Sequence, residues 1–398
     1  MEDVRSVVEL LRRLVAFDTV SSKPNTALID WAAQRLEDAG FRCFVQQGDE
    51  PGKANLLASV GSDDVAGWML SGHSDVVPVA GQNWSSDPFT LREDDGRLYG
   101  RGTADMKGFL ACVLDAAPRL AAAKLRTPVH VAFSYDEETT MRGMRRLAAH
   151  LADAPTRPAG CIIGEPTSMH VVVANKGAAG YRVRVRGHSV HSALRDRGVS
   201  AVEQAAEIIV FIGRLQRELD AAARHDGFDY PHTSVHVGRI EGGTAHNITA
   251  KDCEFVLEIR TLPGMRSTDV LDAVRRHCDE VVLPAMRRIA PDTAISFEEI
   301  FDTPPLDEHG NAELARAVAP LCGNEALRRV SFGTEAGILQ EIGVPTVVCG
   351  PGDIAVAHQP DEYVEIAQLQ RCSRFLDALG RRLSEAAPDR HSRGAVRQ

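Results

Sequence analysis

The sequence has no run of apolar residues that approaches the roughly 18 needed to cross a membrane, so no membrane-spanning helix and no membrane partner are expected. The first residues, Met-Glu-Asp-Val-Arg, carry two acidic side chains and no apolar segment. We therefore expect no secretory signal peptide and a cytoplasmic protein. The chain also contains no internal repeat and no low-complexity tract.

An excess of positive charge is absent as well. The formal net charge is −10 and the isoelectric point is about 5.8. Proteins that bind nucleic acids in general have a basic face, so nucleic acid is not an expected partner. An anionic small substrate stays possible, because a local field can oppose the net charge.

Cysteine is present but never in a Cys-x-x-Cys arrangement. The eight cysteines are scattered, at positions 43, 112, 161, 253, 278, 322, 349 and 372. In a reducing compartment such residues behave as small buried hydrophobes. Any metal ion in this protein would therefore be bound by histidine and carboxylate groups.

What the chain does contain is an ordinary globular composition, with 44% hydrophobic and 25% charged residues over 398 positions, enough for two domains. Over residues 1–177, segments with helical spacing alternate with short apolar runs bounded by Gly, Asp and Asn. This pattern predicts a layered α/β domain. Helices are expected at 4–15, 26–39, 106–123 (kinked or ended by Pro118) and 139–152, and strands at 41–46, 55–60, 68–72, 128–134 and 160–163.

The pattern changes near Gly177. Residues 181–186 alternate strictly, as in a strand with one solvent-facing side. The following elements give the order β-α-β-β-α-β, a ferredoxin-like module, with helices at 199–223 and 267–285 and strands at 233–240, 252–261 and 294–299. We therefore predict that residues 178–300 form a domain inserted into the first. The first domain would resume over 301–398 with a strand at 344–349, a helix at 364–384 and a frayed polar tail at 388–398.

Histidine and acidic residues follow several predicted strands. His73 and Asp75 come directly after the strand that ends in Ser-Gly, and similar positions are held by Asp105, Asp136, Glu137, Glu138, Glu165 and His358. Because strand ends of a layered α/β sheet meet at one crevice, we expect these side chains to lie together. Taken singly, each has an ordinary interpretation, such as a helix cap or a solvated helix start.

Imidazole and carboxylate groups without thiolates suit a pair of divalent metal ions such as zinc. Two metal ions need a shared carboxylate between them. Asp75 can hold the far ring nitrogen of His73 and so fix its tautomer. Of two adjacent glutamates, one can bind metal while its neighbour serves as general base. The pattern itself does not assign ligands to individual metal ions.

Five ordered segments carry a resemblance to a known family. They are 71–78 (Ser-Gly-His-Ser-Asp-Val-Val-Pro), 98–108 (Leu-Tyr-Gly-Arg-Gly-Thr-Ala-Asp-Met-Lys-Gly), 136–139 (Asp-Glu-Glu-Thr), 163–167 (Ile-Gly-Glu-Pro-Thr) and 357–363 (Ala-His-Gln-Pro-Asp-Glu-Tyr). Over nearly its whole length the chain resembles the M20 family of metallo-amidohydrolases, most closely the members that deacetylate acetylornithine. The resemblance implies a di-metal catalytic domain with an inserted dimerisation domain, and two divalent ions, zinc or cobalt.

The resemblance also implies which residues bind metal. His73 and Glu165 would bind one ion, and Glu138 and His358 would bind the other. Asp105 would bridge the two ions.

Catalytic roles follow from the same resemblance. Asp75 would orient His73, and Glu137 would act as general base, taking a proton from water and passing it to the leaving amine. The inserted domain would form a homodimer, so that His191 reaches the active site of the partner subunit and stabilises the oxyanion. Val190 stands where the family usually has glycine before this histidine.

Three further residues resemble substrate-binding positions of the family. Asn247 and Arg260 would bind the substrate carboxylate, and an arginine fork suits a pair of carboxylate oxygens. The alternative for Arg260 is an ion pair at a strand end. Thr334, in a Gly-Thr-Glu-Ala segment, would line the substrate pocket.

The implied activity is hydrolysis of Nα-acetyl-L-ornithine to acetate and L-ornithine, a step of arginine biosynthesis. Other substrates stay open: N-succinyl-diaminopimelate, N-acetylcitrulline, a broad aminoacylase range, or a peptide or dipeptide. No residue is identified as the partner of the δ-ammonium group. A protein that binds metal or ligand without catalysis is the alternative from a different class, and the presence of Glu137 beside every expected ligand speaks against it.

Overall fold

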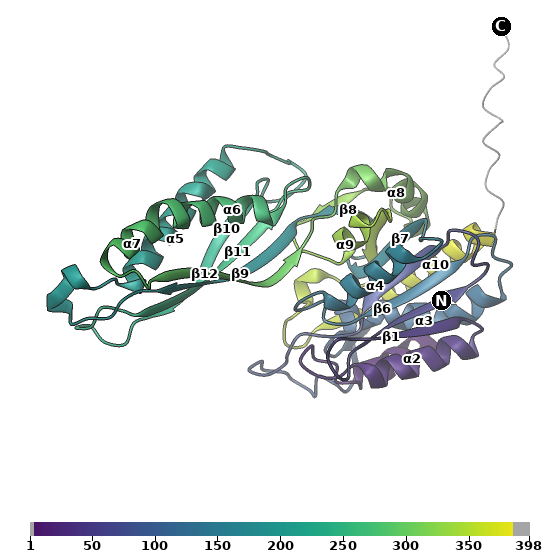
Figure 1. The fold of residues 1–398 in the computed structure, drawn as a ribbon. Coiled ribbons are helices and arrows are strands. Elements are labelled where there is room, and N and C mark those ends of the chain that lie inside the picture. The colour runs from purple at the N-terminus through teal and green to yellow at the C-terminus, as the bar shows by residue number, and fades with distance from the viewer. Residues whose placement is uncertain (1–3, 385–398) are drawn as a thin grey trace, which may run out of the picture.

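The computed structural model describes residues 4–384, and the predicted frayed tail at 388–398 lies outside this range. Figure 1 shows two bodies, one built around a large sheet and the other around a smaller, elongated sheet. Within the described range, no helix is long and apolar enough to cross a membrane.

The large sheet has eight strands and is mixed. Its order is β1 (Arg42–Gln47), β2 (Ala54–Val60), β6 (Val129–Ser134), β3 (Trp68–His73), β7 (Gly160–Pro166), β14 (Thr346–Gly350), β8 (Val172–Asn175) and β13 (Arg328–Val330). The neighbouring strands β6, β3, β7 and β14 run parallel to one another. Their carboxyl ends therefore lie at one edge, as the sequence pattern predicts.

Helices cover both faces of this sheet because its buried strands are apolar on both sides. Leu70 and Val131 face one layer, while their neighbours Met69 and Ala132 face the other. The first layer contains α1 (Arg5–Val15), α2 (Thr26–Asp38), α3 (Gly108–Ala122), α8 (Ala312–Val318) and α10 (Ile366–Ser384). The second contains α4 (Arg142–Asp153) and α9 (Ala336–Glu341).

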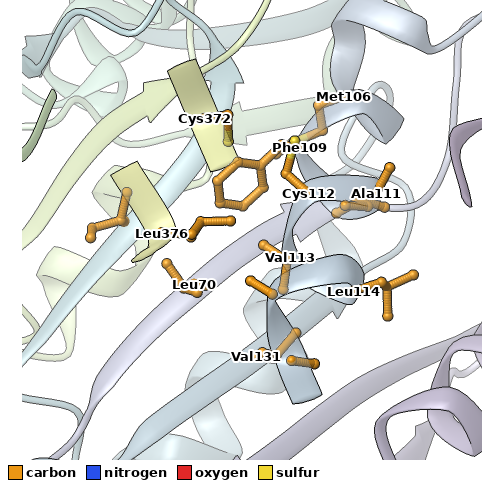
Figure 2. Packing of buried hydrophobic residues seen from close by; sticks show 14 of the residues in the cluster. Leu70, Met106, Phe109, Ala111, Cys112, Val113, Leu114, Val131, Cys372 and Leu376 are labelled. Carbon is orange, nitrogen blue, oxygen red and sulfur yellow. The ribbon is translucent and has the colours of Figure 1, made fainter. Parts of the chain in front are cut away.

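α3 packs between α10 and β7, the strand that leads to Glu165. Figure 2 shows Cys372 and Leu376 of α10 directed toward Phe109 of α3. The ring of Phe109 lies so close to β7 that a Cβ atom at Gly164 would be 2.0 Å from it. Only glycine fits there, which explains the Gly in the Gly-Glu-Pro-Thr segment.

The second body has a four-stranded antiparallel sheet in the order β10 (Ser234–Gly242), β11 (Asp252–Thr261), β9 (Gly177–Arg186) and β12 (Ala294–Thr303). One face is covered by α5 (Ala201–Asp220), α6 (Ser267–His277), η3 (Cys278–Val282) and α7 (Leu283–Ile289). The chain order of these elements agrees with the predicted β-α-β-β-α-β pattern. The opposite face carries a network of ion pairs that joins Arg182 and Arg184 to Glu254 and Glu298.

Several short elements depart from the sequence prediction. The glycine-rich segment at 96–102, where no strand was predicted, contains β5 (Arg97–Tyr99) in a small sheet with β4 (Arg92–Asp94) and β15 (Tyr363–Glu365). α3 begins at Gly108, two residues later than predicted, because the helical turn η1 (Thr103–Lys107) precedes it. Pro118 lies inside α3, and the helix continues beyond it to Ala122.

Candidate active site

The predicted histidine and acidic residues converge at the carboxyl edge of the parallel strands. His73 ends β3, and Glu165 lies in β7. Glu137 and Glu138 follow β6, Asp105 lies in η1, and His358 follows η6 (Ile354–Val356). His73, Asp105 and Glu165 are buried, whereas the side chain of His358 is 49% exposed. The cluster is therefore open to solvent on the His358 side.

Asp105 lies between the two histidines and directs one carboxylate oxygen to each. Its Oδ1 is 2.9 Å from Nε2 of His73, and its Oδ2 is 3.1 Å from Nε2 of His358. Glu165 Oε1 is 3.7 Å from Nε2 of His73, and Glu138 Oε2 is 3.0 Å from Nε2 of His358. His73 thus lies with Glu165, His358 lies with Glu138, and Asp105 contacts both histidines.

Glu137 belongs to the same cluster. Its carboxylate and the ligand atoms of His73 and Glu165 all lie within 4.8 Å of one another. A second set, with the same limit, consists of His73, Asp105 and Glu138. Such sets of imidazole and carboxylate groups can bind divalent metal ions.

Burial and mutual repulsion perturb the carboxyl groups of the cluster. Burial, with Asp105 close by, raises the pKa of Glu138 to about 7. The pKa values of Glu137 and Glu165 are raised well above their ordinary range, again chiefly by burial. The hydrogen bonds of His358 to Asp105 and Glu138 raise its pKa to about 10. The protein's own cations therefore do not balance the negative charge that it buries here.

Asp75 acts on the cluster differently from the prediction. The ring Nδ1 of His73 is 2.9 Å from the main-chain carbonyl oxygen of Asp75, whereas the carboxylate Oδ1 is 3.7 Å away. The carboxylate instead accepts hydrogen bonds from the main-chain N–H of Glu137 at 3.1 Å and from the hydroxyl of Ser21 at 2.6 Å. The expectation that the Asp75 carboxylate holds His73 is thus corrected: the carbonyl holds the ring, and the carboxylate positions the loop of Glu137.

A buried ion pair supports the loop that carries Asp105. Arg101 and Glu362 are each 1% exposed, and Arg101 donates to Glu362 over 2.5 Å. Glu362 also accepts hydrogen bonds from the main-chain N–H groups of Gly102, Ala104 and Asp105, at 3.1, 2.9 and 3.1 Å. Sequence reasoning assigned Glu362 no role, although it lies within the 357–363 segment that carries the resemblance.

Two further buried acids lie close to the cluster. Asp136, which the sequence grouped with Glu137 and Glu138 but gave no role, accepts a 2.6 Å hydrogen bond from Lys53, which also donates to the main-chain carbonyl of Ser21. Glu335 accepts a 2.7 Å hydrogen bond from Ser134, and its burial raises its pKa to about 7. Glu335 was not identified from the sequence, where its only signal is its place next to Thr334.

A cavity of about 400 Å³ opens beside the cluster and brings Arg260 to it. Glu137, Glu138 and His358 line one side, and Arg260 of β11 lines another, with apolar surface from residues such as Phe301. Arg260 is also bound to Glu258, two residues away on the same strand, with a 2.8 Å hydrogen bond from its Nε. Arg260 thus both forms an ion pair on its own strand and lines the cavity, so the two interpretations of this residue are compatible.

Three predicted site residues lie apart from the cavity. Thr334 is fully buried, and its hydroxyl donates to Asn175 over 3.0 Å and accepts from the main-chain N–H of Ala336. A substrate-binding role for Thr334 stays a prediction. His191 and Asn247 are exposed neighbours in the loops beyond the far end of β9, where Ser192 N–H donates to the carbonyl of Asn247.

Comparisons with known proteins agree with this arrangement. A sequence model of peptidase family M20/M25/M40 matches residues 69–382. Acetylornithine deacetylase of Myxococcus xanthus is 41% identical over 381 residues, covering 92% of this chain and 94% of that protein. The Proteus mirabilis protein of the same name is 37% identical, covering 94% and 95%.

The fold also matches solved structures. A Bacillus subtilis protein, described as a dinuclear metal-binding peptidase of the M20 family, superposes with a TM-score of 0.64 at 16% identity, covering 94% of this chain and 96% of that one. At this identity the match speaks for the fold alone. The family match spans most of the chain, and the named relatives exceed 30% identity along nearly its full length, so the chain belongs to the peptidase family M20/M25/M40.

Proposed function

We propose that this M20 enzyme hydrolyses the acetyl amide of Nα-acetyl-L-ornithine, with two divalent metal ions bound in its active site. The observation that carries the proposal is the convergence of two histidines and four carboxylates at one sheet edge, beside a cavity that Arg260 enters. The substrate is inferred from relatives that are named acetylornithine deacetylase. A family match alone would leave the acyl group and the amino acid open.

The side chains present fit a pair of metal ions. Two atoms bound tetrahedrally at usual zinc distances lie about 3.4 Å apart. The separations from His73 to Glu165 and from His358 to Glu138 are 3.7 and 3.0 Å. Oε1 of Glu165 is buried without a hydrogen-bond partner among the described residues, as expected for an atom that awaits a cation.

In this proposal His73 and Glu165 would hold one ion, Glu138 and His358 would hold the other, and Asp105, which contacts both histidines, would be shared between them. Bound divalent ions would supply Lewis-acid polarisation of the amide carbonyl and would lower the pKa of water in the site. Zinc suits these ligands best, and cobalt accepts the same set.

Glu137 is the proposed general base. It takes a proton from the attacking water and delivers it to the amine nitrogen as the C–N bond breaks, which leaves acetate and the free amino acid. The Asp75 carboxylate accepts from the main-chain N–H of Glu137, so it holds this residue over the cavity. Arg260 would bind the carboxylate of the substrate with its planar fork, in exchange for part of its pairing with Glu258.

The second body, residues 178–300, is proposed to form the dimer. Its edge strand β10 has no neighbour on one side among the described strands, and free strand edges favour pairing. Among the described residues, seven of the eleven exposed large hydrophobic side chains belong to this segment: Leu194, Val210, Tyr230, Ile240, Ile248, Val281 and Ile289. Concentrated apolar surface is typical of an interface. His191 of the partner subunit would then stabilise the oxyanion.

The decisive experiment compares kcat/KM of zinc-loaded enzyme for three substrates: Nα-acetyl-L-ornithine, N-succinyl-L,L-diaminopimelate and N-acetyl-L-methionine. We expect a preference for acetylornithine of tenfold or more, which is about 1.4 kcal/mol of differential transition-state binding. Such a preference would place the enzyme in arginine biosynthesis. A flat profile or a preference for a competitor would refute the substrate while leaving the hydrolytic chemistry intact. Absence of hydrolysis of every acyl amino acid and dipeptide, with two metal ions bound, would refute catalysis.

A further inference from the structure

A second cavity, of about 600 Å³, lies on the outer side of α10, away from the candidate active site. It is enclosed by α10, by the turn η5 (Ala319–Cys322) and by the loop after β7. Its polar lining consists of Ser168, His170, Asn324, Arg371, Arg374 and Arg381. Among residues 4–384, no Asp or Glu lines it, although acidic residues outnumber basic ones by 55 to 45 in the whole chain. The cavity is thus a locally cationic site on an acidic protein.

The position of the arginines follows from the periodicity of α10. Arg371 and Arg381 are separated by ten residues, close to three helical turns, and so they lie on one face. The opposite face is apolar and packs into the core, where Figure 2 shows Cys372 and Leu376. Within residues 4–384, no carboxylate forms an ion pair with Arg371 or Arg381, and both side chains are exposed. Both guanidinium groups are therefore available to a ligand.

His170 in the cavity wall is hydrogen-bonded to Arg328, which does not itself line the cavity. Nδ1 of His170 is 3.2 Å from the carbonyl oxygen of Thr167, so it carries the proton, and Nε2 accepts a 2.9 Å hydrogen bond from Arg328. Asn324 uses its carbonyl oxygen to accept from the main-chain N–H of Ala326, which leaves its amide N–H groups to donate. Arg371, Arg381 and the amide of Asn324 therefore offer donors to a ligand, whereas the Ser168 hydroxyl already donates to the carbonyl of Gly352.

We infer that this cavity binds a small molecule with at least two separated anionic groups, each either phosphoryl or carboxylate. Both oxyanions accept paired hydrogen bonds from a guanidinium fork. Arg371 and Arg381 are about 15 Å apart along the helix axis, so one compact anion cannot engage both well. Carbon surface from Met169, Pro320 and Leu321 would contact the spacer between the two groups.

The site borders the loop that leads out of the active site. Ser168 and Met169 follow Glu165 by three and four residues, and their main-chain N–H groups donate to the carbonyls of Gly352 and Gly350, at 2.7 and 2.9 Å. An occupant of the cavity would contact this loop but none of the candidate metal ligands. Binding is therefore separable from the catalytic proposal and can be tested without reference to the substrate.

The test is isothermal titration calorimetry of the metal-loaded enzyme at constant ionic strength, with fructose 1,6-bisphosphate as the phosphoryl probe and suberate as the dicarboxylate probe. We expect saturable binding of one molecule per chain by at least one probe. The double variant Arg371→Gln/Arg381→Gln should weaken it at least tenfold. Arg382→Gln is the matched control, because Arg382 is exposed on the same helix and does not line the cavity. Which probe binds identifies the anionic group. No saturable heat with either probe, or equal heat in the double variant, would overturn the inference.

A cysteine in the cavity wall gives a second, local readout. Cys322 is partly buried and lines the cavity, whereas Cys43, also partly buried, lies elsewhere. Saturating probe should slow alkylation of Cys322 at least threefold relative to Cys43 in the native enzyme and in Arg382→Gln, and leave it unchanged in the double variant. Heat of binding without any protection of Cys322 would assign the anion to another site and reject the inference.

Discussion

The role proposed for His191 of the partner subunit leads to a quantitative prediction about mixtures of two inactive variants. β9 starts at Gly177, next to Ala178 in the wall of the active-site cavity, and ends at Arg186. Nine residue steps of a strand span about 30 Å. His191 lies beyond that far end. If residues 178–300 rotate as a rigid body about the start of β9, the distance from His191 to the start of β9 does not change. Within one chain, His191 therefore cannot reach the cluster around Asp105.

Each single variant should be nearly inactive. Replacing Glu137 by Gln removes a general base, which typically costs about 10²–10⁴ in rate. Replacing His191 by Ala removes an oxyanion donor, which typically costs about 10²–10³ in kcat. In a mixed dimer, the His191→Ala subunit keeps its own Glu137 and receives an intact His191 from its partner. The other site of that dimer lacks both groups.

Equal amounts of the two variants, after random exchange, should recover about a quarter of wild-type activity, because half of the dimers are mixed and each has one complete site. The assay is acetate release after exchange, with dimer composition measured by native mass spectrometry of differently tagged subunits. Two controls bound the result. A mixture of His191→Ala with the double variant His191→Ala/Glu137→Gln should recover nothing, and His188→Ala, at a neighbouring exposed histidine, should stay near wild type.

Recovery no greater than the sum of the two separate activities, with mixed dimers demonstrated, would refute the argument. It would mean either that His191 acts within its own chain, so that residues 178–300 rearrange internally, or that His191 takes no part in catalysis. The activity of His191→Ala alone separates these two cases, because the second predicts a variant near wild type.

Three further predictions concern the site and its supports. Glu137→Gln should retain two metal ions per chain, measured by plasma mass spectrometry, while kcat falls at least a hundredfold, as expected for loss of a general base; near-normal kcat would show that the base lies elsewhere. Glu362→Gln should lower the free energy of unfolding by about 3 kcal/mol in urea titrations, because it leaves Arg101 buried without its counter-charge. The control is Glu365→Gln, at an exposed glutamate. An equal effect of both substitutions would contradict the supporting role of Glu362. In the native protein, Ellman's reagent should react only with Cys43 and Cys322, because the other six thiols are buried, and Cys43 should react slowly at neutral pH because burial raises its pKa to about 11. All eight thiols should react after unfolding, and fewer than eight would indicate disulfides.

The larger elements were predictable because each has enough residues to display a period. The alternation over 181–186 belongs to β9, and the apolar spacing near the N-terminus belongs to α1. β4, β5 and β15 have three residues each, too few for a period, and the pairing of β5 with β15 joins segments more than 250 residues apart. The predicted effect of Pro118 also depended on tertiary structure. The packing of α3 against the sheet and α10 outweighs the local cost of proline, so the helix continues past it.

At the site, the residue types were predictable but their atomic partners were not. Parallel strands bring their carboxyl ends together, so His73, Glu137 and Glu165 could be grouped from strand positions alone. Whether the ring of His73 meets the carbonyl or the carboxylate of Asp75 depends on backbone torsion angles that a single sequence does not reveal. Glu362 shows the same limit, since a glutamate in a loop looks exposed until the fold buries it against three main-chain N–H groups.

The supports around the cluster explain why so much negative charge can be placed at one sheet edge. Glu362 is neutralised by Arg101, and Asp136 by Lys53, so two of the buried carboxylates that support the site have a cation supplied by the chain itself. The innermost carboxylates are treated differently. Glu165 has no Lys or Arg partner, and its pKa and that of Glu137 are raised because burial and neighbouring acids oppose their ionisation. Unlike Glu362 and Asp136, Glu137 and Glu165 have no Lys or Arg partner among the described residues, which suits a site for a ligand of opposite charge. Removing the metal ions with a chelator should therefore lower the melting temperature as well as abolish turnover, whereas Glu165→Gln should make the metal-free protein more stable while weakening metal binding.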